Sequence, residues 1–308
     1  MQHKQSHMRD IIKVDTIDQY NKLFGLETLH PLVAVVDLSK APVWPEHFCF
    51  NYGFYCLYVK DAKCGKITYG RQPYDYQEGS IVCFGPGQVA HVEMEEGTKP
   101  SGIGILFHPD LIRNTPLSRE IGRYSFFSYE ANEALHLSER ERKIIIECIE
   151  KIEYEVDRII DKHSQRLIAT NIELLLDYCM RFYDRQFITR SNVNHDVITK
   201  FESFLEEWYK NDSMRQSGLP SVKYFADKVF LSPNYFGDLV KKETGMTAQE
   251  HIQMKMLNVA KDFIVNTKLS ISQIAFELGF QYSQHFNRVF KKATGYTPLE
   301  YRRLQAAS

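Results

Sequence analysis

Long hydrophobic runs are missing from this sequence of 308 residues. No apolar run approaches the roughly 18 residues that a membrane-spanning helix needs. The first ten residues, MQHKQSHMRD, are polar and lack the apolar core of a secretory signal. Both absences argue against a membrane or secreted protein, and we expect a cytoplasmic protein without a membrane partner.

Cysteine is scarce and scattered. None of the six cysteines belongs to a Cys-x-x-Cys pair, and their spacing is not that of a disulfide framework. We expect reduced thiols in a cytosolic environment. The six residues are Cys49, Cys56, Cys64, Cys83, Cys148 and Cys179.

The common catalytic and metal motifs are also absent. The sequence has no glycine loop for phosphate and no motif that pairs a nucleophile with a base. His47, His91 and His108 are isolated, and none belongs to a His-x-His pair. We therefore expect no catalytic residue, no metal site and no cofactor.

Charge is nearly balanced overall but differs between the two ends. Residues 219–308 contain 12 Lys and Arg against 7 Asp and Glu, a net charge of +5. Residues 1–218 contain 26 against 32, a net charge of −6. The difference suggests that the C-terminal end binds a polyanion and that the remainder has another task.

Short runs typical of β-strands fill residues 30–110. Turn sequences such as Gly85-Pro86-Gly87 separate them, and we find no helical pattern between them. Closely spaced strands of this kind indicate a small barrel or sandwich, and we assign residues 1–135 to it. A barrel of this size can enclose one small ligand. The predicted strands read LVAVVDL, FYCLYVK, KITYG, SIVCF and AHVEME.

Two amphipathic helices are predicted next, in residues 136–190. Ser138 and Glu141 have the spacing of a capping box, which starts a helix, and a break is expected near Lys162-His163-Ser164. The apolar stripes pack either on the barrel or on a second subunit, and the pattern does not separate these alternatives. The stripes contain Ile145, Ile149, Ile152, Val156 and Ile159 or Ile160, then Leu167, Ile168, Ile172, Leu175, Cys179 and Phe182.

A polar segment without periodicity, TRSNVNH at 189–195, is the best candidate for a linker. Every pattern after it is helical, and we assign residues 191–308 to one all-α domain. Two related stretches lie fifty residues apart when aligned on Phe236 and Phe286, namely NYFGDLVKKETGMTAQEH and YSQHFNRVFKKATGYTPLEYRR. One structural unit used twice suggests a partner that itself repeats, such as double-stranded DNA.

The first copy has the pattern of a helix-turn-helix. A short helix is predicted from Ser221 to Val229, and Ser232 then caps a second helix that Pro233 starts. Gly245 ends this second helix as the glycine after the C-cap. A longer helix to about Val265 follows and would hold the two copies at a fixed separation.

The second copy repeats the pattern. Ser270 and Gln273 form a capping box, Gly279 gives the turn, and Gly295 ends the second helix. A last helix starts at the box that begins with Thr297. The inward stripes of the two second helices are apolar, and they contain Phe236, Leu239 and Val240, then Phe286, Val289 and Phe290.

The outward stripes of these second helices have the chemistry of base recognition. Arginine reads guanine, and Asn or Gln reads adenine, in the major groove. The second stripe supplies Gln284, Asn287 and Arg288, whereas Gly237 and Asp238 weaken the first.

Residues from about Val197 to Arg303 carry the stretch IAFELGF…HFNRVFKKATGYTPLEYR, which resembles the DNA-binding domain of AraC/XylS-type transcription regulators. The remainder resembles that family's usual arrangement. The resemblance implies an α+β multidomain fold. It would comprise an all-β cupin-like sensing barrel, a helical hairpin for dimerisation and a C-terminal domain with two helix-turn-helix units.

The resemblance also implies which residues contact DNA. The expected base-reading residues are Asn234, Gly237, Asp238, Gln284, Asn287 and Arg288. The expected phosphate contacts are Ser232, Lys241, Lys242, Ser283, Lys291 and Lys292. Phe230 departs from the small turn residue common in the first unit, and we expect Arg288 to matter more than any residue of the first stripe.

We therefore expect a sequence-specific, DNA-binding transcription regulator, not an enzyme, that forms a homodimer and responds to a small-molecule effector in its barrel. A contact with RNA polymerase stays open. The residues that bind the effector are unknown, because the aromatic side chains between Trp44 and Tyr58 are as well explained by a barrel core. The effector, the target DNA and the sign of regulation are not readable.

The alternative is a cupin-type enzyme, or a DNA-alkyl-transfer protein with an accessory DNA-binding module. Alkyl transfer needs an activated cysteine, and Cys148 and Cys179 lie on apolar helix stripes, where a thiolate is disfavoured.

Overall fold

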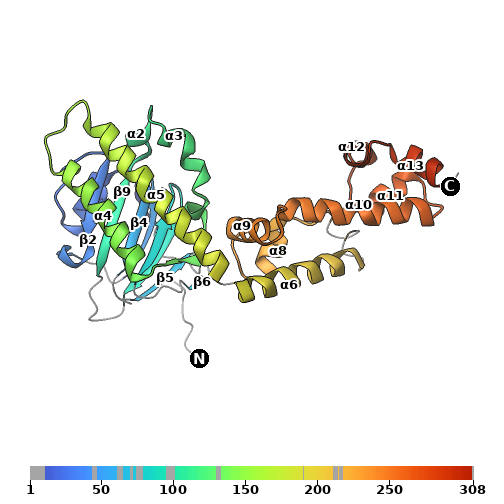
Figure 1. The fold of residues 1–308 in the computed structure, drawn as a ribbon, viewed down its shortest axis with the longest axis horizontal. Coiled ribbons are helices and arrows are strands. Elements are labelled where there is room, and N and C mark those ends of the chain that lie inside the picture. The colour runs from blue at the N-terminus through green and yellow to red at the C-terminus, as the bar shows by residue number, and fades with distance from the viewer. Residues whose placement is uncertain are drawn as a thin grey trace. The chain divides into compact units, whose positions relative to one another are not determined.

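The computed structural model forms two compact units, Met1–Thr189 and Arg190–Ser308 (Figure 1). The structure describes residues 11–43, 47–60, 65–69, 72–73, 79–94, 101–129, 133–189, 191–210, 214 and 218–306.

Two five-stranded sheets build the first unit, in the strand orders β1-β3-β8-β5-β6 and β10-β7-β4-β9-β2. Neighbouring strands are antiparallel except β1 and β3, which are parallel. The strands are β1 Ile12–Val14, β2 Val33–Asp37, β3 His47–Tyr52, β4 Tyr55–Lys60, β5 Gly65–Tyr69, β6 Gln72–Pro73, β7 Ser80–Phe84, β8 Val89–Met94, β9 Gly102–Phe107 and β10 Leu135–His136.

The five predicted strand sequences correspond to β2, β4, β5, β7 and β8, and these predictions are confirmed. The prediction of an all-β first domain is wrong, because helices α1 Ile17–Phe24, α2 Pro109–Ile112 and α3 Leu117–Glu120 belong to the same unit. The signal for α1 was present, since Thr16 and Gln19 form a full capping box and Gly25 ends the helix at φ 67°.

Aromatic side chains fill the space between the sheets. Tyr20 of α1 packs on the rings of Tyr52 and Phe54, and the Tyr58 hydroxyl donates a hydrogen bond to the Tyr20 oxygen at 2.9 Å. All four residues are at most 6% exposed. The crowded aromatic segment therefore forms core in its described part. Trp44 and the Phe48 side chain lie outside the described residues.

A helical hairpin of α4 Glu139–Val156 and α5 Ser164–Thr189 covers the outer face of the second sheet (Figure 1). Its helices contact the two edge strands, β2 and β10. Because this sheet is covered on both faces, every residue of β7 is buried. The two stripes thus pack on their own unit and on each other.

The predicted start and break of the hairpin are confirmed. Ser138 accepts from the Glu141 amide at 3.4 Å, and Glu141 accepts from the Ser138 amide at 2.8 Å. The stripe assignment needs a correction at its ends, because Ile159 and Ile160 lie beyond α4 and are 94% and 54% exposed, and Leu167 is 46% exposed. Periodicity alone does not locate the edge of a buried face.

Helices make up the described part of the second unit. They are α6 Ser191–Lys210, α8 Val222–Lys228, α9 Pro233–Thr244, α10 Ala248–Asn266, α11 Ile271–Glu277, α12 Ser283–Thr294 and α13 Pro298–Ala306. The linker prediction for 189–195 is wrong for most of its length, since Thr189 belongs to α5 and residues 191–195 belong to α6. A helix that starts with polar residues gives no periodic signal in its first turn.

Two similar helix pairs lie in this unit: the first pair is α8 and α9, and the second pair is α11 and α12. Phe201 of α6 packs edge-on against Phe225 and Phe236, and so anchors α6 to the first pair. The second pair packs on α13 through Phe290 and Tyr301. Arg302 of α13 donates to the carbonyl oxygens of Ile264 and Leu269, both at 2.8 Å.

The turn of the first pair holds Phe230 in the left-handed region at φ 59°. A side chain with a Cβ is strained there by roughly 1–2 kcal/mol, and glycine is not. Glycine removes this strain but loses more chain entropy on folding, and the entropy loss offsets part of the gain. We therefore expect Phe230→Gly to raise the free energy of unfolding by about 1 kcal/mol. The matched variant Phe230→Ala removes the ring and keeps the strain. If both variants have equal stability in urea titrations, backbone strain is not the cause.

Candidate DNA-binding interface

The second helix of each pair has a defined start and end. Ser232 caps α9 by accepting from the Tyr235 amide at 3.1 Å, and Pro233 occupies the first turn. Gly245 and Gly295 end α9 and α12 at φ 76° and 82°, a conformation that favours glycine. The glycines thus end both helices at equivalent positions, and the serine cap starts α9.

The outward stripe of α9 carries little recognition chemistry. Asn234 is exposed and Asp238 is half-buried. Gly237 is half-buried, and a Cβ added to it would meet nothing within 4 Å. The position therefore has room for a side chain but presents none.

The stripe of α12 is richer in hydrogen-bonding groups. Gln284 and Arg288 are exposed one turn apart on the same face, and Asn287 lies half-buried between them. The Oδ1 atom of Asn287 is buried and has no hydrogen-bond partner among the described residues. The Asn287 amide thus keeps unused capacity for a hydrogen bond.

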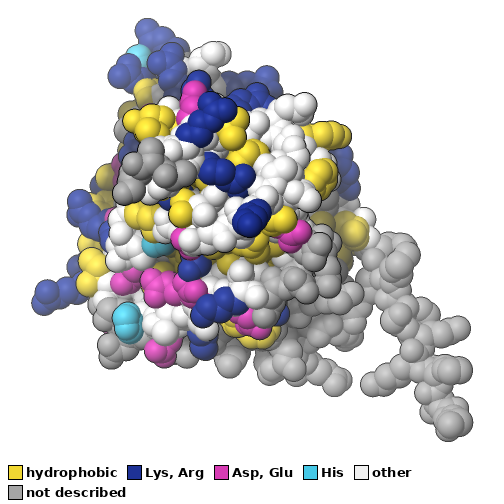
Figure 2. Space-filling model, turned by 90° about the vertical axis from the view of Figure 1, so that its right-hand side faces the viewer, with side chains coloured by type: hydrophobic (Ala, Val, Ile, Leu, Met, Phe, Trp, Pro, Cys, Tyr) yellow, Lys and Arg dark blue, Asp and Glu magenta, His cyan; other side chains and the backbone are white. Residues whose placement is uncertain are grey.

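Lysines follow both stripes. Lys241 and Lys242 are exposed in the last turn of α9, and Lys291 and Lys292 are exposed at the equivalent place in α12. Figure 2 views the end that carries α12 and α13, and lysine and arginine side chains occur at several places on this face. Cations of this kind suit phosphate contacts.

Two expected phosphate contacts fare differently. Ser232 is 1% exposed, and its hydroxyl serves as the helix cap. Its side chain is therefore not placed to contact a phosphate. Ser283 is half-buried at the first position of α12. The cap position of α12 is held by Tyr282, which makes no capping hydrogen bond through its side chain.

A backbone contact between the turn of the second pair and the segment before the first pair was not predicted from the sequence. Gly279, in the turn of the second pair, lies against Gly218 and Met214, which precede the first pair. A Cβ on Gly279 would lie 2.6 Å from the Gly218 carbonyl carbon and 2.9 Å from the Met214 oxygen. Only glycine permits this approach, which ties the turn of one pair to the entry of the other. The sequence indicates this contact only through Gly279 itself, which was interpreted as a turn residue.

Four of the described cysteine thiols lack the surroundings of a nucleophile. Burial raises the pKa of the Cys56 and Cys83 thiols well above the ordinary value, and it also raises the pKa of Cys148 and Cys179. These four groups therefore stay protonated, which argues against their use in alkyl transfer. In the described ranges, no group of three or more His, Cys, Asp or Glu could hold a metal ion. The same ranges contain no helix long and apolar enough to cross a membrane.

Comparison with known proteins identifies the family. A family model described as a helix-turn-helix domain matches residues 225–304. The transcriptional activator RhaS of Escherichia fergusonii is 32% identical over 279 residues, which span 90% of this chain and 94% of RhaS. The chain belongs to the AraC/XylS family of transcription regulators.

Other relatives of this AraC/XylS chain match a smaller share of it. The transcriptional regulatory protein YesN of Bacillus subtilis is 37% identical over 91 residues, which span 29% of this chain and 25% of YesN. The transcriptional activator and DNA repair enzyme AdaA of the same species is 32% identical over 84 residues, 27% of this chain and 40% of AdaA. Several such relatives are thus matched over less than half of their length. The matched range of the family model includes both stripes and all four lysines.

Proposed function

We propose that this AraC/XylS-type chain is a sequence-specific DNA-binding transcription regulator with two helix-turn-helix units. The observation that carries the proposal is the exposed face of α12. It combines Arg288 and Gln284 with Asn287 and ends in two lysines. The family model supports the same use of these helices.

In the proposed recognition, different side chains contact the bases and the phosphates. Arg288 has a rigid fork of donors that matches the two acceptors of guanine, and Gln284 and Asn287 suit adenine. Lys291 and Lys292 neutralise phosphates and position α12. The first pair contributes Asn234, Lys241 and Lys242. Because Gly237 has no side chain and Asp238 is anionic, we expect its half of the site to be the less selective.

Selection of bound sequences from a random DNA library with the full-length chain tests this proposal. We expect a motif in two blocks about one helical turn, roughly 10 bp, apart. Affinity for the selected site should fall steeply as salt rises, because phosphate contacts release counterions. Enrichment of no sequence, or binding insensitive to salt, would refute the proposal.

An effector site in the first unit completes the proposed regulator. The first unit has the two-sheet arrangement that a cupin-like sensing domain requires. Tyr20, Tyr52 and Phe54 occupy the interior between the sheets. A ligand inside the described interior would therefore have to displace aromatic side chains. Another cavity of this unit is the better candidate for an effector site.

We further propose that α5 forms a homodimer contact. Leu167, Leu174 and Ile188 are 46%, 39% and 64% exposed, and their numbers differ by 7 and 14. Apolar residues at intervals of seven lie along one seam of a helix, as in coiled coils. Such a seam fits a second copy of the same helix.

The dimer contact predicts an effect of charge on the seam. We expect Leu174→Glu to convert the dimer to a monomer, because the new carboxylate would be desolvated between two helices. Ser118→Glu places the same charge on an exposed position of α3 rather than of α5 and should leave the dimer intact. Light scattering over a concentration series measures both, and equal masses for the two variants would contradict the contact.

A further inference from the structure

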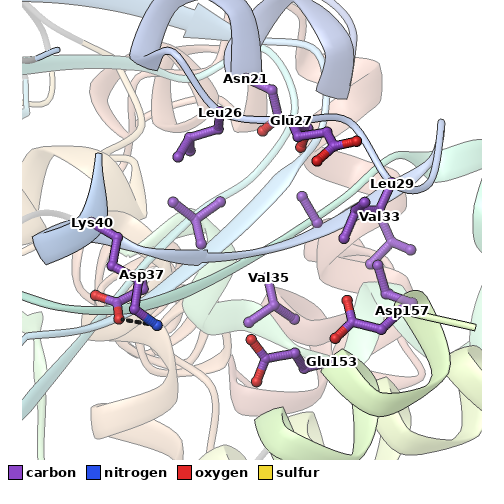
Figure 3. A pocket seen from close by; sticks show the side chains of 13 residues that line it. Asn21, Leu26, Glu27, Leu29, Val33, Val35, Asp37, Lys40, Glu153 and Asp157 are labelled. Carbon is purple, nitrogen blue, oxygen red and sulfur yellow. Dashed lines mark hydrogen bonds and ion pairs between the residues drawn. The ribbon is translucent and has the colours of Figure 1, made fainter. Parts of the chain in front are cut away.

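A pocket of about 190 Å³ lies at the edge of the second sheet, outside the aromatic interior (Figure 3). Strand β2 forms its floor, the segment that follows α1 forms one side, and the end of α4 forms the other. The volume exceeds the roughly 150 Å³ of a cavity known to hold benzene. The pocket thus has room for a small organic molecule.

The charge of this pocket is strongly negative. Its lining contains four carboxylates, Glu27, Asp37, Glu153 and Asp157, against one ammonium, Lys40, an excess of three negative charges. Lys40 pairs with Asp37 at 3.1 Å. Within the described residues, the other three carboxylates form no ion pair. Their combined field favours a cation and opposes an anion.

A buried hydrogen-bond acceptor is the second feature of the pocket. Asn21 of α1 is 2% exposed, lines the pocket and points from α1 toward it (Figure 3). Its Oδ1 atom has no hydrogen-bond partner within the described part of the chain. A buried polar atom without a partner lowers stability, so a donor from a ligand would be favoured there.

The orientation of the Asn21 amide follows from its neighbours. The Thr28 hydroxyl donates to the Asp18 carboxylate at 3.2 Å, so Thr28 Oγ1 must accept from Asn21 Nδ2, which lies 3.1 Å away. The Asp18 carboxylate is ionised, because the hydrogen bond from Lys22 lowers its pKa. Asn21 Nδ2 also donates to the Glu27 carbonyl oxygen at 3.3 Å. Both hydrogen atoms of Asn21 Nδ2 are thus used in hydrogen bonds, and Asn21 Oδ1 is the atom without a partner among the described residues.

We propose that this pocket binds a small organic cation that carries N–H donors, such as a primary amine. Glu153, Asp157 and Glu27 would supply the charge, and Asn21 would accept a hydrogen bond. Val33 and Val35 would contact the apolar part of the ligand (Figure 3). A bare metal ion fits less well, since no group of three carboxylate, His or Cys side chains in the described ranges could hold one.

The pocket also adjoins the helical hairpin. Glu153 and Asp157 lie at the end of α4, which packs along α5, and α5 ends at Thr189, directly before the second unit. A ligand bound between β2 and α4 would contact the α4 end of this hairpin. The use of the amine as an effector rests on the proposed function, whereas binding of the amine does not.

Calorimetric titration of the full-length chain at pH 7 tests the site with three probes of equal size. Butylammonium has charge and N–H donors, tetramethylammonium has charge without donors, and butanol has no charge. We expect butylammonium to bind, tetramethylammonium to bind at least about tenfold more weakly, and butanol to give no heat. Absence of heat with butylammonium at millimolar concentration, or equal affinity for the two cations, would overturn the proposal.

Variants locate the bound cation. We expect the double variant Glu153→Gln with Asp157→Asn to weaken butylammonium binding about tenfold. Glu150→Gln, one turn earlier on the exposed face of α4, should leave it unchanged. Equal binding by wild type and double variant would place the cation elsewhere and refute the site. A chain that binds butylammonium but selects no DNA would refute the proposed function and leave this site standing.

Discussion

Replacement of Gly279 by alanine is expected to lower the free energy of unfolding of the second unit by about 3 kcal/mol. Two costs combine at this position. The backbone is left-handed at φ 83°, where a Cβ costs roughly 1–2 kcal/mol. The new methyl group would also lie 2.6 Å from the backbone of Gly218, and forcing atoms into such a packed site costs typically 1–3 kcal/mol.

Gly295→Ala is the matched control for this variant. Its φ of 82° is nearly the same, but a Cβ there meets nothing within 4 Å. The control should therefore cost only the conformational part, about 1 kcal/mol. The sequence contains two tryptophans, so a Trp44→Phe background leaves Trp208 of α6 as the fluorescent reporter of the second unit in urea titrations.

The difference between the two variants measures the contact between Gly279 and the segment that leads into the first pair. If Gly279→Ala and Gly295→Ala are equally destabilising, the approach of Gly279 to Gly218 does not contribute. If the difference is found, the contact helps to fix one pair relative to the other. We then expect Gly279→Ala to bind DNA sites with altered spacing between the two blocks nearly as well as the selected site.

Local signals explain what could be predicted from the sequence. Capping boxes were predicted at Ser138, Ser270 and Thr297, and each exists because the two hydrogen bonds join residues three apart. The equivalent box at Thr16 was overlooked, although the same signature marks it. Helix α1 was therefore missing from the prediction, and so was the Tyr20 side chain that it packs into the core between the sheets.

Other features depend on residues that are distant in the sequence. Periodicity placed Leu167 on a buried stripe, yet its exposure depends on what α4 and the second sheet cover. Gly279 and Gly218 are 61 positions apart, and their contact follows from how the helix pairs fold together. The same holds for the pocket near Asn21, which joins α1, β2 and α4. Composition and spacing cannot place such groups side by side.

The DNA contacts lie between these cases. The stripe of α12 was predicted from helical spacing, and the structure leaves Gln284 and Arg288 exposed as a contact requires. Ser232 shows the limit of the same reasoning. A serine at the start of a helix can serve either as a cap or as a phosphate ligand, and only its burial decides for the cap.

Arg288→Ala is expected to weaken binding to the selected DNA site by about 1–3 kcal/mol, or roughly 5- to 150-fold. Its loss should also relax base preference at one position of one block, since a bidentate contact to guanine discriminates between bases. Lys292→Ala should behave differently. It should weaken all sequences alike and reduce the slope of affinity against salt by about one ion.

Arg303→Ala supplies the control for charge, because Arg303 is an exposed arginine on α13 rather than on α12. Fluorescence anisotropy with the selected site and with single-base variants of it measures all three substitutions over a salt series. A loss of affinity for Arg288→Ala that is the same for every sequence would make Arg288 a phosphate contact. Base recognition would then have to come from Gln284 and Asn287. A loss confined to sites with one particular base identifies the position that Arg288 reads, and so fixes the register of α12 on the DNA.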